Sequence, residues 1–208
     1  MLIFFLSFIS LFFCFGFNSI AEEYVGKSKE PVETLYLVPF DGASSDILKQ
    51  IGEALKKQLP LNYKILPSIK AESGAFNSHR RQYFSSKLLE QMRKQYSFPN
   101  GRILGVIDYD LYVPQLNFVF GEADIDNKCA IISITRLRQE FYSVNSDNKL
   151  FFKRVITEAV HELGHTYGLQ HCRDKYCVMF FSNSLRDTDR KGFNFCQSCL
   201  KNLQHQFK

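Results

Sequence analysis

The sequence predicts an α/β (α+β) fold, in which a mixed twisted sheet is backed by helices. Two observations favour this fold class. Short runs of β-branched and aromatic residues alternate with segments whose apolar residues recur at helical spacing. The 208 residues are 45% hydrophobic and 23% charged, which is the balance of one globular domain large enough to bury a core.

The chain begins with a segment that is typical of a secretory signal peptide. Residues 1–17 are uncharged and almost wholly apolar, and Ser19 and Ala21 are small residues at the positions that a signal peptidase reads. No basic residue precedes the apolar run, and an uncleaved membrane anchor of similar length has the same pattern. We expect residues 1–21 to be removed and the protein to be periplasmic or secreted, without stable membrane association. A membrane anchor is the alternative.

The first strand and helix follow this segment. LYLVPF (35–40) predicts a strand, and Ser44-Ser45-Asp46 then offers an N-cap to an amphipathic helix. YKILPSI (63–69) predicts a second strand. The segment 80–96 predicts a second helix, with Tyr83 and Phe84 on its apolar face.

The remaining strands precede a third helix. GRILGVIDYDLYV (101–113) predicts one strand, and residues 116–137 predict two strands around a turn at 124–128. After the turn-rich segment 143–148, apolar residues recur at helical spacing as far as Leu163. We therefore expect a mixed sheet of four or five strands that packs against this third helix.

The third helix carries the stretch HELGHTYGLQHC (161–172). An α-helix advances about 100° per residue, so His161 and His165 lie on one side, where both can bind a single ion. Glu162 is displaced from that pair but can reach a water molecule on the metal. Gly168 permits the backbone conformation that ends a helix, so that the chain can turn back and His171 can complete a site of three histidines.

Three neutral ligands leave the fourth position of a zinc ion open for water, whose pKa the ion lowers to about 7. Glu162 can then take the proton from this water and pass it to a leaving amine. Histidine and glutamate on a helix are usually surface residues, but here the glycine and the third histidine also stand at the required offsets. The motif therefore indicates hydrolysis of peptide bonds by a zinc-dependent metallopeptidase.

At these residues the chain resembles the archaemetzincin family of the metzincin metallopeptidases. HExxHxxGxxH is matched in full, and Cys172, Cys177, Met179 in a CxM step and Cys196-Gln-Ser-Cys199 follow it. RRQYFSSKLL and VIDYDLYVPQLNFVFGEA are also similar to that family, so the resemblance covers most of residues 22–208. The segment between Met179 and Cys196 is one residue shorter than in the family's pattern, which implies a shorter loop.

The resemblance implies a metzincin-like zincin. Residues 22–168 would form an upper half that ends in the active-site helix, and residues 169–208 a small C-terminal region stabilised by zinc. His161, His165 and His171 would bind the catalytic zinc, with Glu162 as the general base. Met179 would form the Met-turn, a hydrophobic floor under the metal, which is compatible with an ordinary buried methionine.

The resemblance also implies a second, structural zinc on Cys172, Cys177, Cys196 and Cys199. The x4 and x2 spacings suit a site of four cysteines. Outside the cytoplasm, however, four cysteines more often form two disulfides, and the spacing does not exclude them. We favour zinc because Cys196-x-x-Cys199 fits a metal knuckle better than an unstrained disulfide loop. Cys129 is expected to be a core residue, and His79 and His205 surface residues.

The expected partner is a peptide or protein substrate bound by a monomer. An edge strand above the active-site helix would pair with its main chain, and our candidates are Ala130, Ile131, Ile132, Ser133, Ile134 and Thr135. The formal net charge of +5 is spread along the chain, so no nucleic-acid partner is expected. The alternative function is a zinc-stabilised peptide- or protein-binding module with little general proteolytic activity. The intact Glu162 argues against it, because a scaffold needs no base beside its metal.

Overall fold

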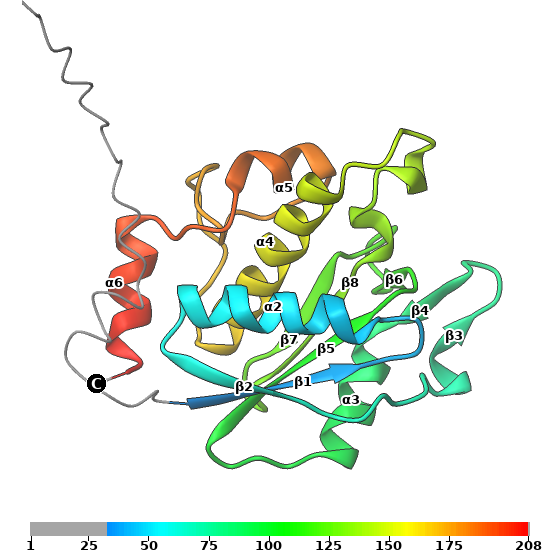
Figure 1. The fold of residues 1–208 in the computed structure, drawn as a ribbon, viewed down its shortest axis with the longest axis horizontal. Helices are drawn as coiled ribbons and strands as arrows, with labels where there is room; N and C mark the ends of the chain where they lie inside the picture. The colour runs from blue at the N-terminus through cyan, green and yellow to red at the C-terminus, as the bar shows by residue number, and fades with distance from the viewer. Residues whose placement is uncertain (1–32, 208) are drawn as a thin grey trace, which may run out of the picture.

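A five-stranded sheet forms the centre of the computed structural model, which describes residues 33–207 (Figure 1). Four strands are parallel, and the last strand in the order is antiparallel to its neighbour. The order is β2 (Leu61–Ile65), β1 (Glu33–Pro39), β5 (Gly101–Ile107), β8 (Cys129–Ser133) and β7 (Gly121–Asp124). The expected signal peptide, residues 1–21, lies outside the described residues. Within residues 33–207, no helix combines the length and the apolar character that a membrane crossing requires.

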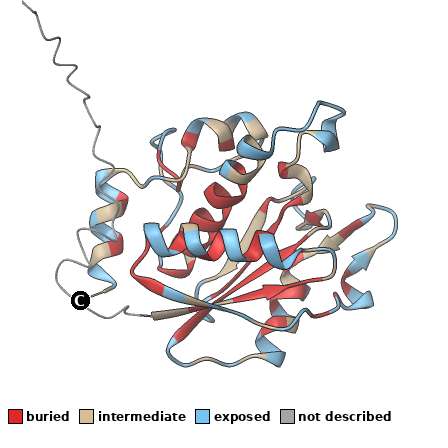
Figure 2. Ribbon diagram, viewed as in Figure 1, coloured by how far each residue is buried: buried red, intermediate tan, exposed pale blue. Residues whose placement is uncertain are grey.

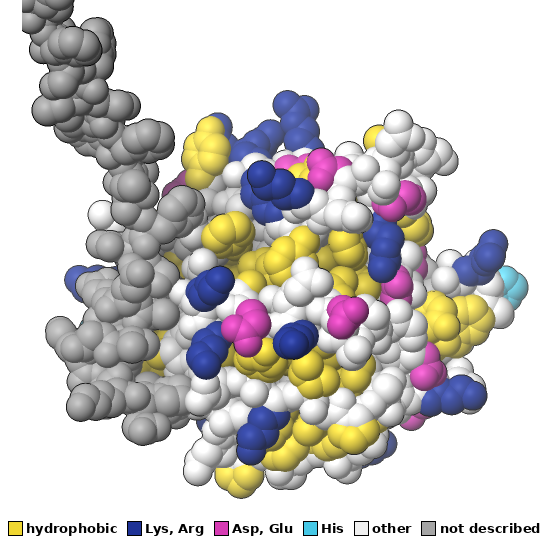
Figure 3. Space-filling model, in the orientation of Figure 1, with side chains coloured by type: hydrophobic (Ala, Val, Ile, Leu, Met, Phe, Trp, Pro, Cys, Tyr) yellow, Lys and Arg dark blue, Asp and Glu magenta, His cyan; other side chains and the backbone are white. Residues whose placement is uncertain are grey.

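Three helices cover the two faces of this sheet. They are α2 (Ser45–Gln58), α3 (Ser85–Gln95) and α4 (Asn148–Thr166). Helices α2 and α4 share one buried cluster with one face, and α3 packs with the other face (Figures 1 and 2). On the outer surface of α2 and α4, apolar side chains remain visible between charged ones (Figure 3). The predicted mixed sheet with backing helices is therefore confirmed.

Helices α2 and α4 lie where the sequence predicts them, and side-chain caps fix where each one begins. The hydroxyl of Ser44 accepts a hydrogen bond from the backbone N–H of Ile47 at 3.3 Å, which caps α2. Asp147 caps α4 in the same way, through a bond of 2.9 Å from the N–H of Leu150. Gly168, with φ +82°, follows the end of α4 and turns the chain back.

The prediction of one helix over residues 80–96 is wrong at its start. Arg81 adopts φ +56°, which interrupts a helix, and α3 begins only at Ser85. The Tyr83 ring packs 5.1 Å from that of Phe76, so the aromatic residues join a sheet rather than a helix face. This second, three-stranded sheet has the order β3 (Phe76–Asn77), β4 (Gln82–Phe84) and β6 (Leu111–Tyr112).

The segment predicted as one strand over residues 101–113 is two strands in separate sheets. Between β5 and β6 the chain presents Asp108 and Asp110. Arg138 lies 2.5 Å from Asp108, and Arg136 lies 2.7 Å from Asp110. These ion pairs occupy both carboxylates at the point where the chain leaves the central sheet.

The C-terminal region packs beside α4 through two short helices, α5 (Leu185–Lys191) and α6 (Gln197–His205). Arg154 forms a bidentate pair with Asp189, at 2.7 Å for each bond, and Lys191 lies 3.3 Å from Glu158 in a fully buried pair. Both pairs connect α4 to α5. Three single-turn 3₁₀ helices complete the described elements: η1 (Ser73–Ala75), η2 (Thr135–Leu137) and η3 (Glu140–Tyr142).

Candidate active site

A cleft of about 510 Å³ lies between α4 and the edge strand β7. All four chemistry-bearing residues of the motif line it: His161, Glu162, His165 and His171. Strand β7 lines the cleft with Gly121, Glu122 and Ala123, and the loop after Met179 adds Phe181. The helix thus supplies His161, Glu162 and His165, the segment after it supplies His171, and the strand supplies a wall with free backbone groups.

The expected substrate strand at Ala130 to Thr135 is wrong. Residues Cys129–Ser133 form β8, which pairs with β5 on one side and β7 on the other and is buried along its length. Ile134 and Thr135 have already left the sheet for the turn η2. Because β8 is an interior strand, its hydrogen bonds are used, and the edge beside the cleft belongs to β7.

The three histidines converge. One ligand atom from each lies within 4.8 Å of the others. The Nε2 atoms of His161 and His165 are 3.2 Å apart. Tetrahedral zinc with nitrogen ligands at about 2.0–2.1 Å separates those nitrogens by roughly 3.3 Å, so this pair is spaced for one ion.

The outer nitrogens of two rings are held by backbone carbonyls. Nδ1 of His161 lies 2.7 Å from the carbonyl oxygen of Val178, and Nδ1 of His165 lies 2.8 Å from that of Leu169. A carbonyl only accepts, so the ring proton resides on Nδ1 in each case. The Nε2 lone pairs are therefore free and point into the cleft, as metal ligands require.

The histidine surroundings favour neutral rings. Burial is the main cause that lowers the pKa of His161 well below its usual value, and the nearby charge of Lys191 adds to it. Burial also lowers the pKa of His165 and of His171. Neutral imidazole is the form that binds a metal ion, so protons compete weakly for these ligands.

Glu162 lies within the same wall and is only 5% exposed. Burial raises the pKa of its carboxyl well above the usual range, Glu158 and Glu122 raise it further, and Lys191 opposes them. Sequence reasoning missed these three neighbours. The spacing of one helical turn between Glu158 and Glu162 was a usable signal, whereas only the packing of α5 and β7 on α4 brings Lys191 and Glu122 near.

Backbone contact positions the Glu162 side chain. A Cβ atom on Gly121 would lie 2.6 Å from Cγ of Glu162 and 2.7 Å from its Oε1, closer than real Cβ atoms approach. The same Cβ would also lie 2.7 Å from the carbonyl oxygen of Ile131. The edge strand therefore lies directly against the carboxyl because residue 121 has no side chain.

Replacing Gly121 with alanine should displace Glu162 and lower kcat/KM by about 10- to 100-fold, since a small misplacement of a catalytic group has costs of that order. Peptide hydrolysis measures the effect, and thermal unfolding checks that the fold survives. Gly74→Ala is the matched control, because a Cβ there meets nothing within 4 Å. Activity of Gly121→Ala equal to that of Gly74→Ala would contradict the positioning role.

Met179 packs against the helix that carries the histidines. It is fully buried, and a Cβ on Gly164 would collide with its sulfur, so the glycine in HELGH lets the two segments touch. The carbonyl of Met179 accepts a hydrogen bond of 2.9 Å from the N–H of Cys172. Because Val178 holds the His161 ring, this short segment connects the histidine cluster to the cysteines.

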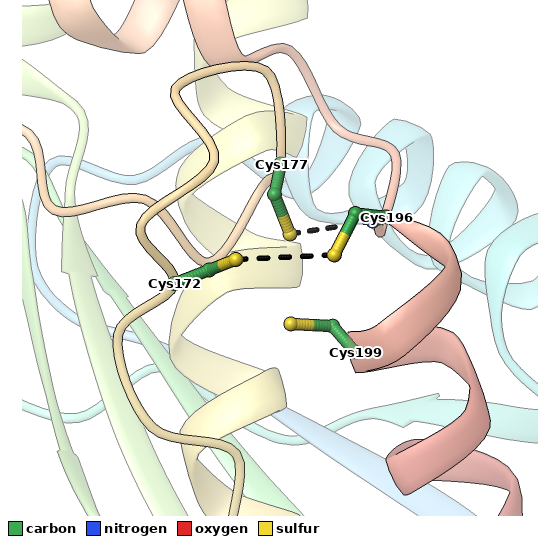
Figure 4. Close-up of side chains that lie close together, drawn as sticks. All are labelled: Cys172, Cys177, Cys196 and Cys199. Carbon is green, nitrogen blue, oxygen red and sulfur yellow. Dashed lines mark hydrogen bonds between the residues drawn. The ribbon is translucent and has the colours of Figure 1, made fainter.

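Four cysteines form a second cluster beside α6 (Figure 4). Cys172 and Cys177 come from the segment after α4, whereas Cys196 and Cys199 stand at the start of α6. All four sulfurs lie within 4.8 Å of one another, and the Cys172 and Cys196 sulfurs are 3.8 Å apart. Zinc–sulfur bonds of about 2.3 Å in a tetrahedron give the same separation, about 3.8 Å. A disulfide would need about 2.05 Å, so the geometry fits a metal better than two disulfides.

Burial is the largest influence on three of these thiols, and it opposes their ionisation. Burial raises the pKa of Cys177 to about 11, and burial followed by the charge of Cys177 raises that of Cys199. Burial acts against ionisation of Cys196 as well, but hydrogen bonds from Cys199 and the neighbouring thiols outweigh it and lower that pKa. A divalent cation would allow all four to ionise together.

The other singled-out residues lie outside both clusters. Cys129 is fully buried in β8, as expected of a core residue, and burial raises the pKa of its thiol to about 12. His79 and His205 are exposed.

Comparison with known proteins gives consistent matches. Residues 24–205 match Peptidase family M54. An archaemetzincin from Methanocaldococcus jannaschii is 41% identical over 162 residues, which are 76% of this chain and 88% of the relative. The crystal structure of an archaemetzincin from Methanopyrus kandleri has a TM-score of 0.72 at 36% identity, covering 86% of this chain and 97% of that one. The crystal structure of a zinc-dependent peptidase from Methanocorpusculum labreanum has a TM-score of 0.68 at 28% identity. The match covers 81% of this chain and 99% of that one.

Proposed function

The chain belongs to peptidase family M54, the archaemetzincins, and is a zinc-dependent metallopeptidase; on this basis we propose a role for each residue of its cleft. His161, His165 and His171 hold the catalytic zinc, and Glu162 is the general base. One observation carries this assignment: three imidazoles converge on one point in a cleft that also contains a buried carboxyl.

The zinc ion and the carboxyl divide the chemistry. Zinc, when bound, supplies a Lewis acid that polarises the scissile carbonyl and makes water acidic enough to ionise near neutral pH. Glu162 accepts the proton of the attacking water and returns it to the leaving amine. Its position one residue after His161, and against the backbone of Gly121, keeps the carboxyl at the reacting centre.

The substrate is a peptide or protein that binds in extended form along β7. The outer edge of β7 pairs with no other strand of the described residues, and the cleft runs beside it. Main-chain pairing to such an edge gives affinity with little sequence preference. Exposed apolar side chains at the cleft, such as Leu116 and Phe181, then favour apolar side chains of the substrate.

The second zinc is structural and is held by Cys172, Cys177, Cys196 and Cys199. Four thiolates close the coordination shell and leave no position for a substrate. The spacing of the sulfurs and the absence of a disulfide among the described cysteines support this assignment.

Cleavage of an unbiased peptide library by the purified protein tests the function. We expect products in mass spectrometry that disappear after chelation and return when zinc is added. A protein that retains zinc but cleaves no member of the library would instead support the alternative function, a zinc-stabilised binding module.

We further propose that the protein is exported and that its mature chain begins at or near Glu22. The small residues Ser19 and Ala21 stand at the two positions that a signal peptidase reads. N-terminal sequencing or intact mass, on protein recovered from its native compartment, measures the start. A mass that corresponds to all 208 residues would instead indicate a membrane anchor.

A further inference from the structure

A second hollow, of about 850 Å³, lies between helices α2 and α4 and is larger than the cleft. We call it the α2–α4 groove. Its apolar lining comes from α2, α4 and the segment after α5: Ala54, Leu150, Phe152, Ile156 and Phe193. Figure 3 shows apolar side chains gathered on this face of the molecule, with basic side chains beside them.

The α2–α4 groove is separate from the active-site cleft. At about 100° per residue, Phe152 and Ile156 lie on the side of α4 roughly opposite to His161 and His165. None of the residues that line the groove also lines the cleft. A ligand in the groove would therefore leave the substrate path open.

Four lysines stand along the two sides of the groove. Lys49 and Lys57 project from α2, and Lys149 and Lys153 project from α4. All four are exposed, and none forms an ion pair within residues 33–207. The groove thus has positive charge on both sides of an apolar floor.

The two acidic residues at the groove already have partners in the chain. Glu53 accepts a hydrogen bond of 2.7 Å from the hydroxyl of Tyr63. Asp147 caps α4 through its bond from Leu150. These bonds come from neutral donors, so both carboxylates keep their charge, and four lysines against two carboxylates leave a net charge of +2 along the groove for a ligand with several negative groups.

The spread of lining residues along both helices indicates the kind of ligand. Its residues span Lys49 to Gln58 on α2 and Asp147 to Ile156 on α4, nine steps on each helix, or roughly 14 Å at 1.5 Å per residue. A partner helix that lies against either wall could contact it over roughly two turns. A fatty acid would place its single carboxylate at one end, whereas the lysines lie along both sides.

We propose that the α2–α4 groove binds an amphipathic helix of a partner protein. The helix would direct its apolar stripe at Phe152 and Ile156, and Asp or Glu residues on both flanks would face the four lysines. Binding of an apolar helix face in a groove between helices is a common mode of recognition, with anchors at i, i+3, i+4 and i+7.

A displayed library of helical peptides, selected on the zinc-loaded full chain, tests this proposal. We expect the enriched peptides to carry an apolar stripe flanked by Asp and Glu on both sides. Their affinity, measured by fluorescence anisotropy, should fall with added salt and should be about tenfold or more weaker for the double variant Lys49→Glu, Lys153→Glu.

Lys56→Glu is the matched control, because this exposed lysine belongs to α2 but does not line the groove. It should change the affinity by less than about twofold. The proposal is overturned if no acidic amphipathic pattern is enriched, or if the enriched peptides bind both variants equally. It is also overturned if the groove mediates dimers of the protein, or binds dodecanoate or anionic vesicles in preference to the helix.

Discussion

Glu162→Gln should abolish peptide hydrolysis while the protein retains its fold and its zinc. Glutamine fills the same volume but cannot take a proton from water, so the loss should be about a thousandfold or more in kcat/KM. Cleavage of a peptide identified from the library measures the activity. Elemental analysis and thermal unfolding, on the same preparation, measure the metal and the fold.

Glu140→Gln provides the control for this change. The same substitution there affects an exposed side chain that does not line the cleft, and activity should be unchanged. Activity of Glu162→Gln within a few-fold of the parent protein would remove Glu162 from the role of general base. Loss of zinc from this variant would show that the carboxyl acts on the metal site rather than on the proton.

Cys199→Ser should remove the structural zinc and strongly destabilise the protein. The parent protein should contain about two zinc ions per chain, and the variant about one. An ion present at about a thousandfold above its Kd stabilises the folded state by about 4 kcal/mol. For a domain of this size, its loss lowers Tm by roughly 10 °C.

Cys129→Ala separates the loss of the metal from the loss of a buried cysteine. Cys129 is also fully buried but lies in β8, away from the cluster, so this variant should keep both zinc ions. In the parent protein, denaturation with chelator and without reductant should expose the four thiols of the cluster. One zinc ion per chain, with those thiols appearing only after reduction, would mean that the cluster is a pair of disulfides.

The hydrogen bond between Met179 and Cys172 connects the cysteine cluster to the histidine site, so Cys199→Ser should affect both. Val178 holds the His161 ring, Met179 packs against Gly164, and the next contact along the chain leads to the cysteines. Loss of the structural zinc would loosen the segment 177–179, which contacts both the His161 ring and Gly164. Cys199→Ser should therefore also weaken binding of the catalytic zinc, which a competition with chelator measures.

Much of the site could be predicted because its geometry is local. His161 and His165 share a side of the helix through its period alone, and Gly168 ends the helix through its own backbone freedom. Ser44 likewise caps α2 from its position in the sequence. In each case the interacting groups are a few residues apart, and the chain between them has one regular conformation.

Other features depend on which segments pack together. Tyr83 and Phe84 suit the apolar face of a helix as well as a short strand, and their contacts in the second sheet decide between the two. Ala130 to Thr135 read as a strand from their composition, but composition does not say whether a strand is at the edge. That depends on β7 folding back as the outermost strand.

The sequence by itself determined the metal-binding helix and its end at Gly168, the N-cap of the first helix, the α/β class and the identity of the cysteines that cluster. Only the tertiary structure decided that β7 borders the cleft, that Gly121 touches Glu162, and that Lys191 lies buried beside Glu158. The physical reason is the range of the interactions. Helix period and capping act over one or two turns, whereas strand order and burial of charge arise from segments that meet only after the chain has folded.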